Sequence, residues 1–269
     1  MSEQFTSNAD GTSGHKEMSF LDHLEELRWH IVKIFIGWLL ATAACGVYAE
    51  YIVYNLLLTP LEKAGLEAQV LAPYGIVLLF MQSVLICGFI ISMPNTLYWL
   101  WRFIAPGLLP KERKHVSLLV AFTTLCFLSG VAFGYFVLIP TALDFFAGFG
   151  TDKIALNISI DRYISFVLAL LVGAGLVFEL PMVSYTLSKI GILTPAFMRH
   201  YRRHAIVAIL IIAALVTPSP DIITQLLLGV PMFLLYELSI LISSVVNKRR
   251  DAELAADLPD PESSGESQS

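Results

Sequence analysis

Charged residues are scarce in this sequence of 269 residues: Asp, Glu, Lys and Arg together make up 14% of it, against about 25% in ordinary soluble domains. Hydrophobic residues make up 56%. Because a chain of this size cannot hide so much apolar surface from water, the composition excludes a soluble globular protein. It also excludes a disordered protein, except at the two ends of the chain.

Cysteine is scarce as well, with three residues that each lie inside an apolar run: Cys45, Cys87 and Cys126. They show no CxxC spacing and fit no extracellular disulfide framework, so we interpret them as small apolar residues. His200 and His204 have the spacing of metal ligands, but no HExxH glutamate accompanies them, so we interpret them as interfacial side chains.

Signatures of catalysis and of nucleotide binding are also missing. The sequence contains no Walker loop, no GxGxxG after a strand and no catalytic-triad signature. We therefore expect no cofactor, no metal, no nucleic-acid partner and no enzymatic activity.

What the sequence does contain is long apolar runs. A bilayer core of about 30 Å needs about 20 apolar residues of helix, and no alternating pattern of a β-barrel is present. The sequence thus predicts an all-α membrane protein with six transmembrane helices and both termini on one side. The expected spans are about 31–48, 75–93, 116–139, 164–187, 205–216 and 222–244.

The basic residues indicate which side the termini occupy. All but three of the 17 Lys and Arg residues lie in the N-terminal region, the 102–115 and 189–204 loops, and the C-terminal region; the exceptions are Lys63, Lys153 and Arg162. By the positive-inside rule, both termini are cytosolic. We expect a multi-pass protein of the cytoplasmic (inner) membrane. It should have a disordered tail at 1–17, a transmembrane domain at 18–250 and an acidic disordered tail at 251–269.

The last two spans are short. The 12 uncharged residues of 205–216 reach about 18 Å as a helix, and the prolines of the following TPSPD sequence (217–221) end that helix. In the sixth span, about 15 residues precede Glu237. Because the 205–237 hairpin is shorter than the hydrocarbon core, we expect the bilayer beside it to be locally thinned, with lipids as direct partners.

Two acidic residues stand out on the basic side. Residues 18–31 (MSFLDHLEELRWHI) form an amphipathic lead-in to the first span, with Glu26 on its polar stripe. In the 99–115 segment, Glu112 lies between Lys111 and Arg113. The ordinary interpretation of Glu26 is that it lies on a solvated helix face. That of Glu112 is a surface ion pair screened by water. The functional interpretation is a carboxylate near the membrane plane that receives an arginine in a bidentate way.

Glu179 lies deep in the fourth apolar run and is followed by Pro181, which predicts a kink. A carboxyl group at that depth by default marks a function. It is a proton site, a polar contact for a partner helix or the lining of a water cavity; the ordinary alternatives are a hydrogen bond within the bundle and a carboxyl group that is simply protonated. Near the last hairpin, Asp221 is expected to cap the sixth span, and Gln225, like Gln82, to make interhelical hydrogen bonds.

These segments together resemble the TatC family, the polytopic receptor subunit of the twin-arginine (Sec-independent) protein translocase. The likeness covers roughly residues 18–250. The residues that carry it are FLDHLEELR (20–28), FIAPGL (103–108) followed by Glu112 and Arg113, FELP (178–181) and TPSPD (217–221).

The resemblance implies a concave bundle that binds the paired-arginine signal peptide of folded proteins and nucleates their proton-gradient-driven export. Its expected partners are single-span subunits of the TatA/TatB type, in an oligomeric complex. The alternative function is a proton- or ion-coupled small-solute transporter that uses Glu179. The implied sites are signal binding by Glu26, Glu112, Arg28 and Arg113; intramembrane polar function of Glu179 and Gln225; and loop structure at Pro60, Pro106, Pro181, Pro218 and Asp221.

Overall fold

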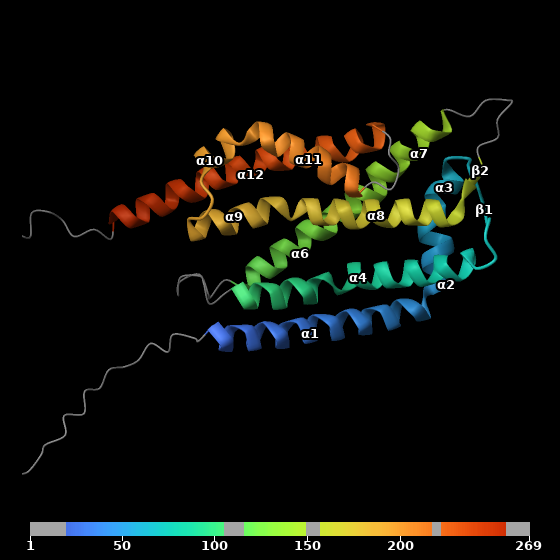
Figure 1. The fold of residues 1–269 in the computed structure, drawn as a ribbon, viewed down its shortest axis with the longest axis horizontal. Helices are drawn as coiled ribbons and strands as arrows, with labels where there is room; N and C mark the ends of the chain where they lie inside the picture. Colours follow the sequence, from blue (N-terminus) through green and yellow to red (C-terminus); the bar gives the residue numbers. More distant parts are fainter. Residues whose placement is uncertain (1–19, 105–115, 149–156, 217–221, 257–269) are drawn as a thin grey trace, which may run out of the picture.

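The computed structural model describes residues 20–104, 116–148, 157–216 and 222–256, and these residues are mainly helical (Figure 1). The elements are α1 (Phe20–Val47), α2 (Ala49–Tyr51), the π-helix η1 (Ile52–Leu57), α3 (Thr59–Lys63), β1 (Glu67–Gln69), α4 (Gly75–Ile104), α6 (Val116–Phe133), the π-helix η3 (Gly134–Leu138), α7 (Ile139–Ala147), β2 (Asn157–Ser159), α8 (Ile160–Phe178), α9 (Leu180–Ile190), α10 (Pro195–His200), α11 (Arg202–Val216) and α12 (Ile222–Ala256).

Long apolar helices make up most of the described part of the chain. Among the described residues, five stretches are long and apolar enough to cross a bilayer: Glu25–Val47, Gly75–Ile104, Ser117–Ala147, Ile160–Ile190 and Ile222–Arg250. α11, with 15 residues, reaches only about 22 Å, so the count of six spans stays a prediction. The start of α1 and the end of α12 lie at the same end of the bundle (Figure 1).

Most helices extend beyond the predicted spans. The first pass begins at Phe20 rather than near 31, because the amphipathic lead-in and the first span form one helix. At the other end of the chain, α12 continues to Ala256, into the segment expected to be the C-terminal tail. The reason is local: the sequence DAELAA (251–256) is made mostly of good helix formers, which extend an existing helix despite their charge.

The hairpin of α11 and α12 ends in the middle of the bundle. Val216 at the end of α11 lies against Gly173 of α8, where a Cβ would collide with the valine side chain. Gly173 is 13 residues into the helical stretch that begins at Ile160, so α11 ends about 20 Å from the Ile160 end of α8. The shortness predicted for 205–216 is thus confirmed. The length of α12 lies toward the end of the bundle where the chain termini are.

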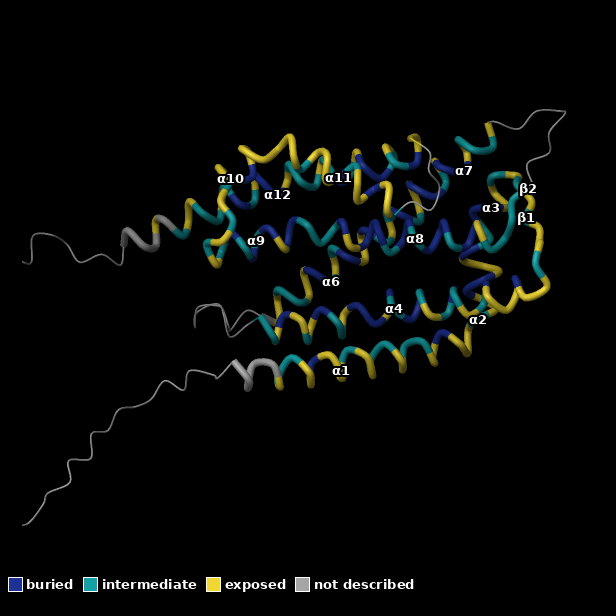
Figure 2. The backbone as a smooth tube through the Cα atoms, in the orientation of Figure 1, coloured by how far each residue is buried: buried dark blue, intermediate teal, exposed yellow. Residues whose placement is uncertain are grey.

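The core of the bundle is centred on α8, which packs against α6, α4 and α12. In its most apolar stretch, the 160–190 pass is 61% buried, whereas the first pass is 11% buried and packs chiefly along α4 (Figure 2). Small residues bring α6 and α8 together: a Cβ on Gly130 would lie 2.6 Å from the Ala174 carbonyl oxygen. The large exposed apolar area of α1 is suited to lipid.

The end of the bundle away from the termini contains features that the sequence did not predict. β1 and β2 form a parallel pair in the register Glu67↔Asn157, Ala68↔Ile158 and Gln69↔Ser159. Nearby, Pro60 is buried in the first turn of α3. Proline has no N–H, so the Leu56 carbonyl loses its helical donor; the Tyr135 hydroxyl donates to it instead, at 2.9 Å.

Candidate functional site

Glu26 and His30 form a buried polar pair where α1 begins. His30 is only 5% exposed, and its Nδ1 lies 2.6 Å from the Glu26 carbonyl oxygen. The Glu26 side chain is half-buried, and its Oε2 is buried without a hydrogen-bond partner among the described residues, as is Nε2 of His30. A buried carboxylate oxygen without a donor is costly, so this site favours an added cation or N–H donor.

Aromatic side chains of α4 form the other wall of this site. His30 contacts Trp99 edge-on, with ring centroids 5.3 Å apart, and Phe103 at 6.2 Å. The Lys33 ammonium lies 4.2 Å from the centroid of Trp99, and the Arg102 guanidinium lies 5.4 Å from it. These cation–π contacts place two cations at Trp99, the ring that His30 contacts.

Two predicted binding residues, Glu112 and Arg113, lie outside the described residues, as does the predicted loop residue Pro106. The described helices that flank their segment, α4 and α6, end and begin at the same end of the bundle as the start of α1 (Figure 1). Arg28 is described and exposed.

Glu179 lies at the break between α8 and α9. Its backbone is helical (φ −76, ψ −18), and Pro181 is in the first turn of α9. The predicted disruption is therefore confirmed, because Pro181 cannot donate to the Val177 carbonyl. Oε1 of Glu179 is buried and has no hydrogen-bond partner in the described part of the chain. The ordinary alternative, a hydrogen bond within the bundle, leaves this oxygen unexplained.

The two glutamines make the contacts expected of them. Gln225 Nε2 donates to the Leu210 carbonyl at 2.9 Å and so joins α12 to α11. Gln82 Nε2 donates to the Ser165 hydroxyl at 3.1 Å, between α4 and α8. Pro218 and Asp221 lie outside the described residues, so the predicted cap by Asp221 stays a prediction; α12 begins at the next residue.

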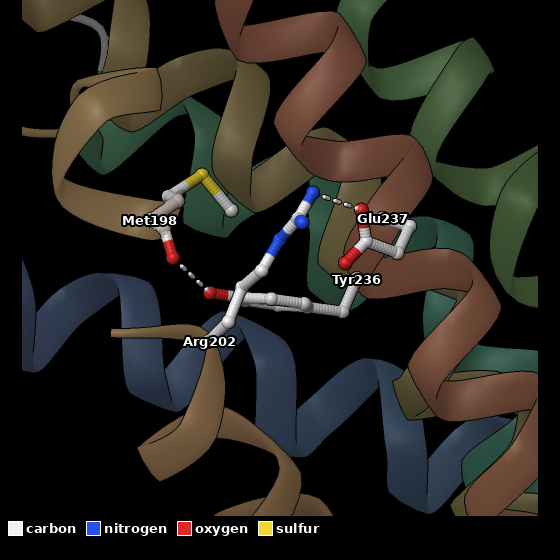
Figure 3. Close-up of polar contacts among 4 residues, drawn as sticks. All are labelled: Met198, Arg202, Tyr236 and Glu237. Carbon is white, nitrogen blue, oxygen red and sulfur yellow. Dashed lines mark hydrogen bonds and ion pairs between the residues drawn. The ribbon is translucent and has the colours of Figure 1, made fainter. Parts of the chain in front are cut away.

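Sequence reasoning missed a contact that fixes the start of α11. Arg202 forms an ion pair with Glu237 of α12 at 2.7 Å, and the Tyr236 hydroxyl donates to the Met198 carbonyl at 2.7 Å (Figure 3). The sequence by itself favours a Glu237 side chain that reaches toward water from the cytosolic end of the sixth span. The signal that could have revealed the pair is a lone carboxylate at the same membrane level as a run of basic residues.

Comparison with known proteins identifies the family. The model of the family "Sec-independent protein translocase protein (TatC)" matches residues 22–231. The chain belongs to the TatC family. It is 35% identical over 237 residues to the TatC protein of Aquifex aeolicus, a match covering 87% of this chain and 98% of that protein. It is 36% identical over 251 residues to the protein of the same name from Koribacter versatilis, covering 89% and 92%.

Solved structures agree with this assignment. A crystal structure of the twin-arginine translocase receptor TatC superimposes with a TM-score of 0.77 at 37% identity, covering 83% of this chain and 99% of that chain. This TatC protein is thus a multi-pass membrane component of a protein translocase. Membership over most of the chain favours that function over a small-solute transporter.

Proposed function

We propose that this TatC protein is the receptor for paired-arginine signal peptides, and that Glu26 and Glu112 bind the two arginines. The observation that carries the proposal is the buried, unpartnered Oε2 of Glu26 at the basic end of the bundle. An arginine guanidinium fits such a carboxylate with two parallel N–H···O bonds, which are stronger in a partly dry site than in bulk water. Lysine lacks this fork.

The wider proposal follows from this site and from the family. Both termini lie in the cytosol, the membrane is the cytoplasmic membrane, and cargo is folded and exported with the proton gradient as driving force. Single-span subunits of the TatA/TatB type assemble around this protein. The buried Glu179 supports a role in the membrane interior, as a proton site or as a polar contact for such a subunit.

The test measures binding of an Arg-Arg signal peptide, and of its Lys-Lys version, to the purified full-length protein. Glu26→Gln and Glu112→Gln should each weaken Arg-Arg binding at least tenfold, and the Lys-Lys peptide should bind the unaltered protein with similarly reduced affinity. Glu25→Gln is the matched control, because Glu25 is the exposed neighbour of Glu26. Unchanged affinity for the Arg-Arg peptide in a variant that carries both substitutions would refute the proposal.

A further inference from the structure

His30 has a second ring nitrogen that bonds to nothing in the described part of the chain. The residue is 5% exposed, and its Nε2 is buried without a hydrogen-bond partner. Nδ1 lies 2.6 Å from the Glu26 carbonyl oxygen, which can only accept, so Nδ1 carries the proton. In the neutral imidazole the other nitrogen is then an acceptor. Nε2 of His30 is therefore a buried acceptor that lacks a donor.

The unpartnered carboxylate oxygen of Glu26 lies within one turn of this nitrogen. Residues four apart are neighbours on a helix, and helical side chains lean toward the preceding turn. The ring of His30 therefore lies over the turn that carries Glu26, as the bond from Nδ1 shows. Oε2 of Glu26 and Nε2 of His30 are both buried without a partner among the described residues. One turn of α1 thus presents two acceptors that lack donors.

The two cations that share the Trp99 ring with His30 have other partners. The Lys33 ammonium lies 4.2 Å from the centroid of that ring, and the Arg102 guanidinium lies 5.4 Å from it. Arg102 also donates to a tyrosine hydroxyl of its own helix at 3.1 Å. These cations therefore leave the two acceptors on α1 to a donor from outside the described chain.

We propose that His30 is a further binding residue for the signal peptide, and that one arginine of the pair donates to both Oε2 of Glu26 and Nε2 of His30. This inference rests on the proposed signal-binding function. A guanidinium carries five N–H groups in a planar fork, so a single group can serve acceptors on two side chains. The aromatic wall of Trp99 and Phe103 suits the same guest, because guanidinium planes stack on aromatic rings.

The first test measures peptide affinity in the full-length protein with His30→Asn. The shorter amide can still donate to the Glu26 carbonyl from the place of Nδ1, but nothing replaces Nε2. Affinity for the Arg-Arg peptide should fall at least fivefold, because a hydrogen bond to a charged group is lost, while affinity for the Lys-Lys peptide should change less than twofold. His200→Asn is the matched control at an exposed histidine of α10, and it should leave both affinities unchanged.

Combining His30→Asn with Glu26→Gln separates this inference from the proposed function. If one guanidinium contacts both residues, the two losses should not add, and the variant with both substitutions should bind more tightly than their product predicts. A loss in Glu26→Gln with unchanged affinity in His30→Asn would overturn the role of His30 and leave the proposed function standing. Additive losses would also overturn it. Unchanged affinity in Glu26→Gln would instead count against the proposed function.

Nitrogen-15 NMR of the unaltered full-length protein gives a readout that a merely structural role of His30 would not move. The Nε2 signal, assigned by its absence in His30→Asn, should move upfield when the Arg-Arg peptide is added, because a nitrogen that accepts a hydrogen bond becomes more shielded. The Lys-Lys peptide should move it less. A signal that does not respond to the Arg-Arg peptide would show that Nε2 takes no donor from the guest, and would overturn the proposal.

Discussion

The imidazole of His30 fixes the backbone of Glu26: its Nδ1 lies 2.6 Å from the Glu26 carbonyl oxygen, one helical turn earlier. A carbonyl oxygen can only accept, so Nδ1 is the donor. Trp99 and Phe103 enclose the imidazole ring on the side of α4. The backbone that carries the candidate binding carboxylate is therefore linked to α4 through the His30 ring.

We predict that His30→Ala weakens signal-peptide binding about tenfold while the protein still folds. The substitution removes the hydrogen bond and two ring contacts, which frees the start of α1 without changing the charge of Glu26. His30→Gln, which keeps a donor, should recover part of the affinity. Peptide affinity and thermal unfolding in detergent are measured together. Ile36→Ala, on an exposed part of the same helix, is the control; equal losses in both variants would contradict a specific role.

A second prediction concerns the end of the bundle away from the termini. The Tyr163 hydroxyl donates to the Leu57 carbonyl at 2.7 Å, and Tyr163 is 2% exposed. Tyr163→Phe leaves that carbonyl buried without a donor, which should cost about 1–3 kcal/mol and lower the unfolding temperature. Tyr48→Phe is the control, because Tyr48 is 66% exposed. The same unfolding temperature for Tyr163→Phe and the unaltered protein would show that another donor replaces the hydroxyl.

The contact between α6 and α8 gives a third prediction. A Cβ at Gly130 would lie 2.6 Å from the Ala174 carbonyl oxygen, a backbone atom that cannot rotate away. Gly130→Ala should therefore separate the helices and lower both the yield of folded protein and its unfolding temperature. Gly46→Ala should be tolerated, because its Cβ would have Val84 at 3.9 Å. Tolerance at both positions would mean that the two helices shift apart at little cost.

The membrane passes were predictable because apolar composition and helix length are local properties of the sequence. Glu179 and Pro181 were visible for the same reason, as a charge and a helix breaker within an apolar run. The sequence could indicate a basic partner for Glu237 but not which one, since Arg202 lies 35 residues away and the pairing depends on how α11 folds back on α12. The pairing of β1 with β2 joins residues about 90 apart in sequence, and their two three-residue strands have no periodicity that indicates a sheet.

The last prediction is that the bilayer thins beside the hairpin of α11 and α12. The 15 residues of α11 reach about 22 Å, against about 30 Å of hydrocarbon, and Val216 stops beside Gly173 in mid-bundle. A spin label at Val216→Cys, in a protein whose native cysteines are replaced by serine, should therefore report polar contact at a depth where bulk lipid is dry. Lengthening the lipid chains should lower the unfolding temperature, because the mismatch grows. A label at Leu176, exposed on α8 at 48%, is the control and should report a dry environment. If both labels were equally dry, the membrane would keep its full thickness at the hairpin, and the missing length of α11 would have to be covered by protein instead.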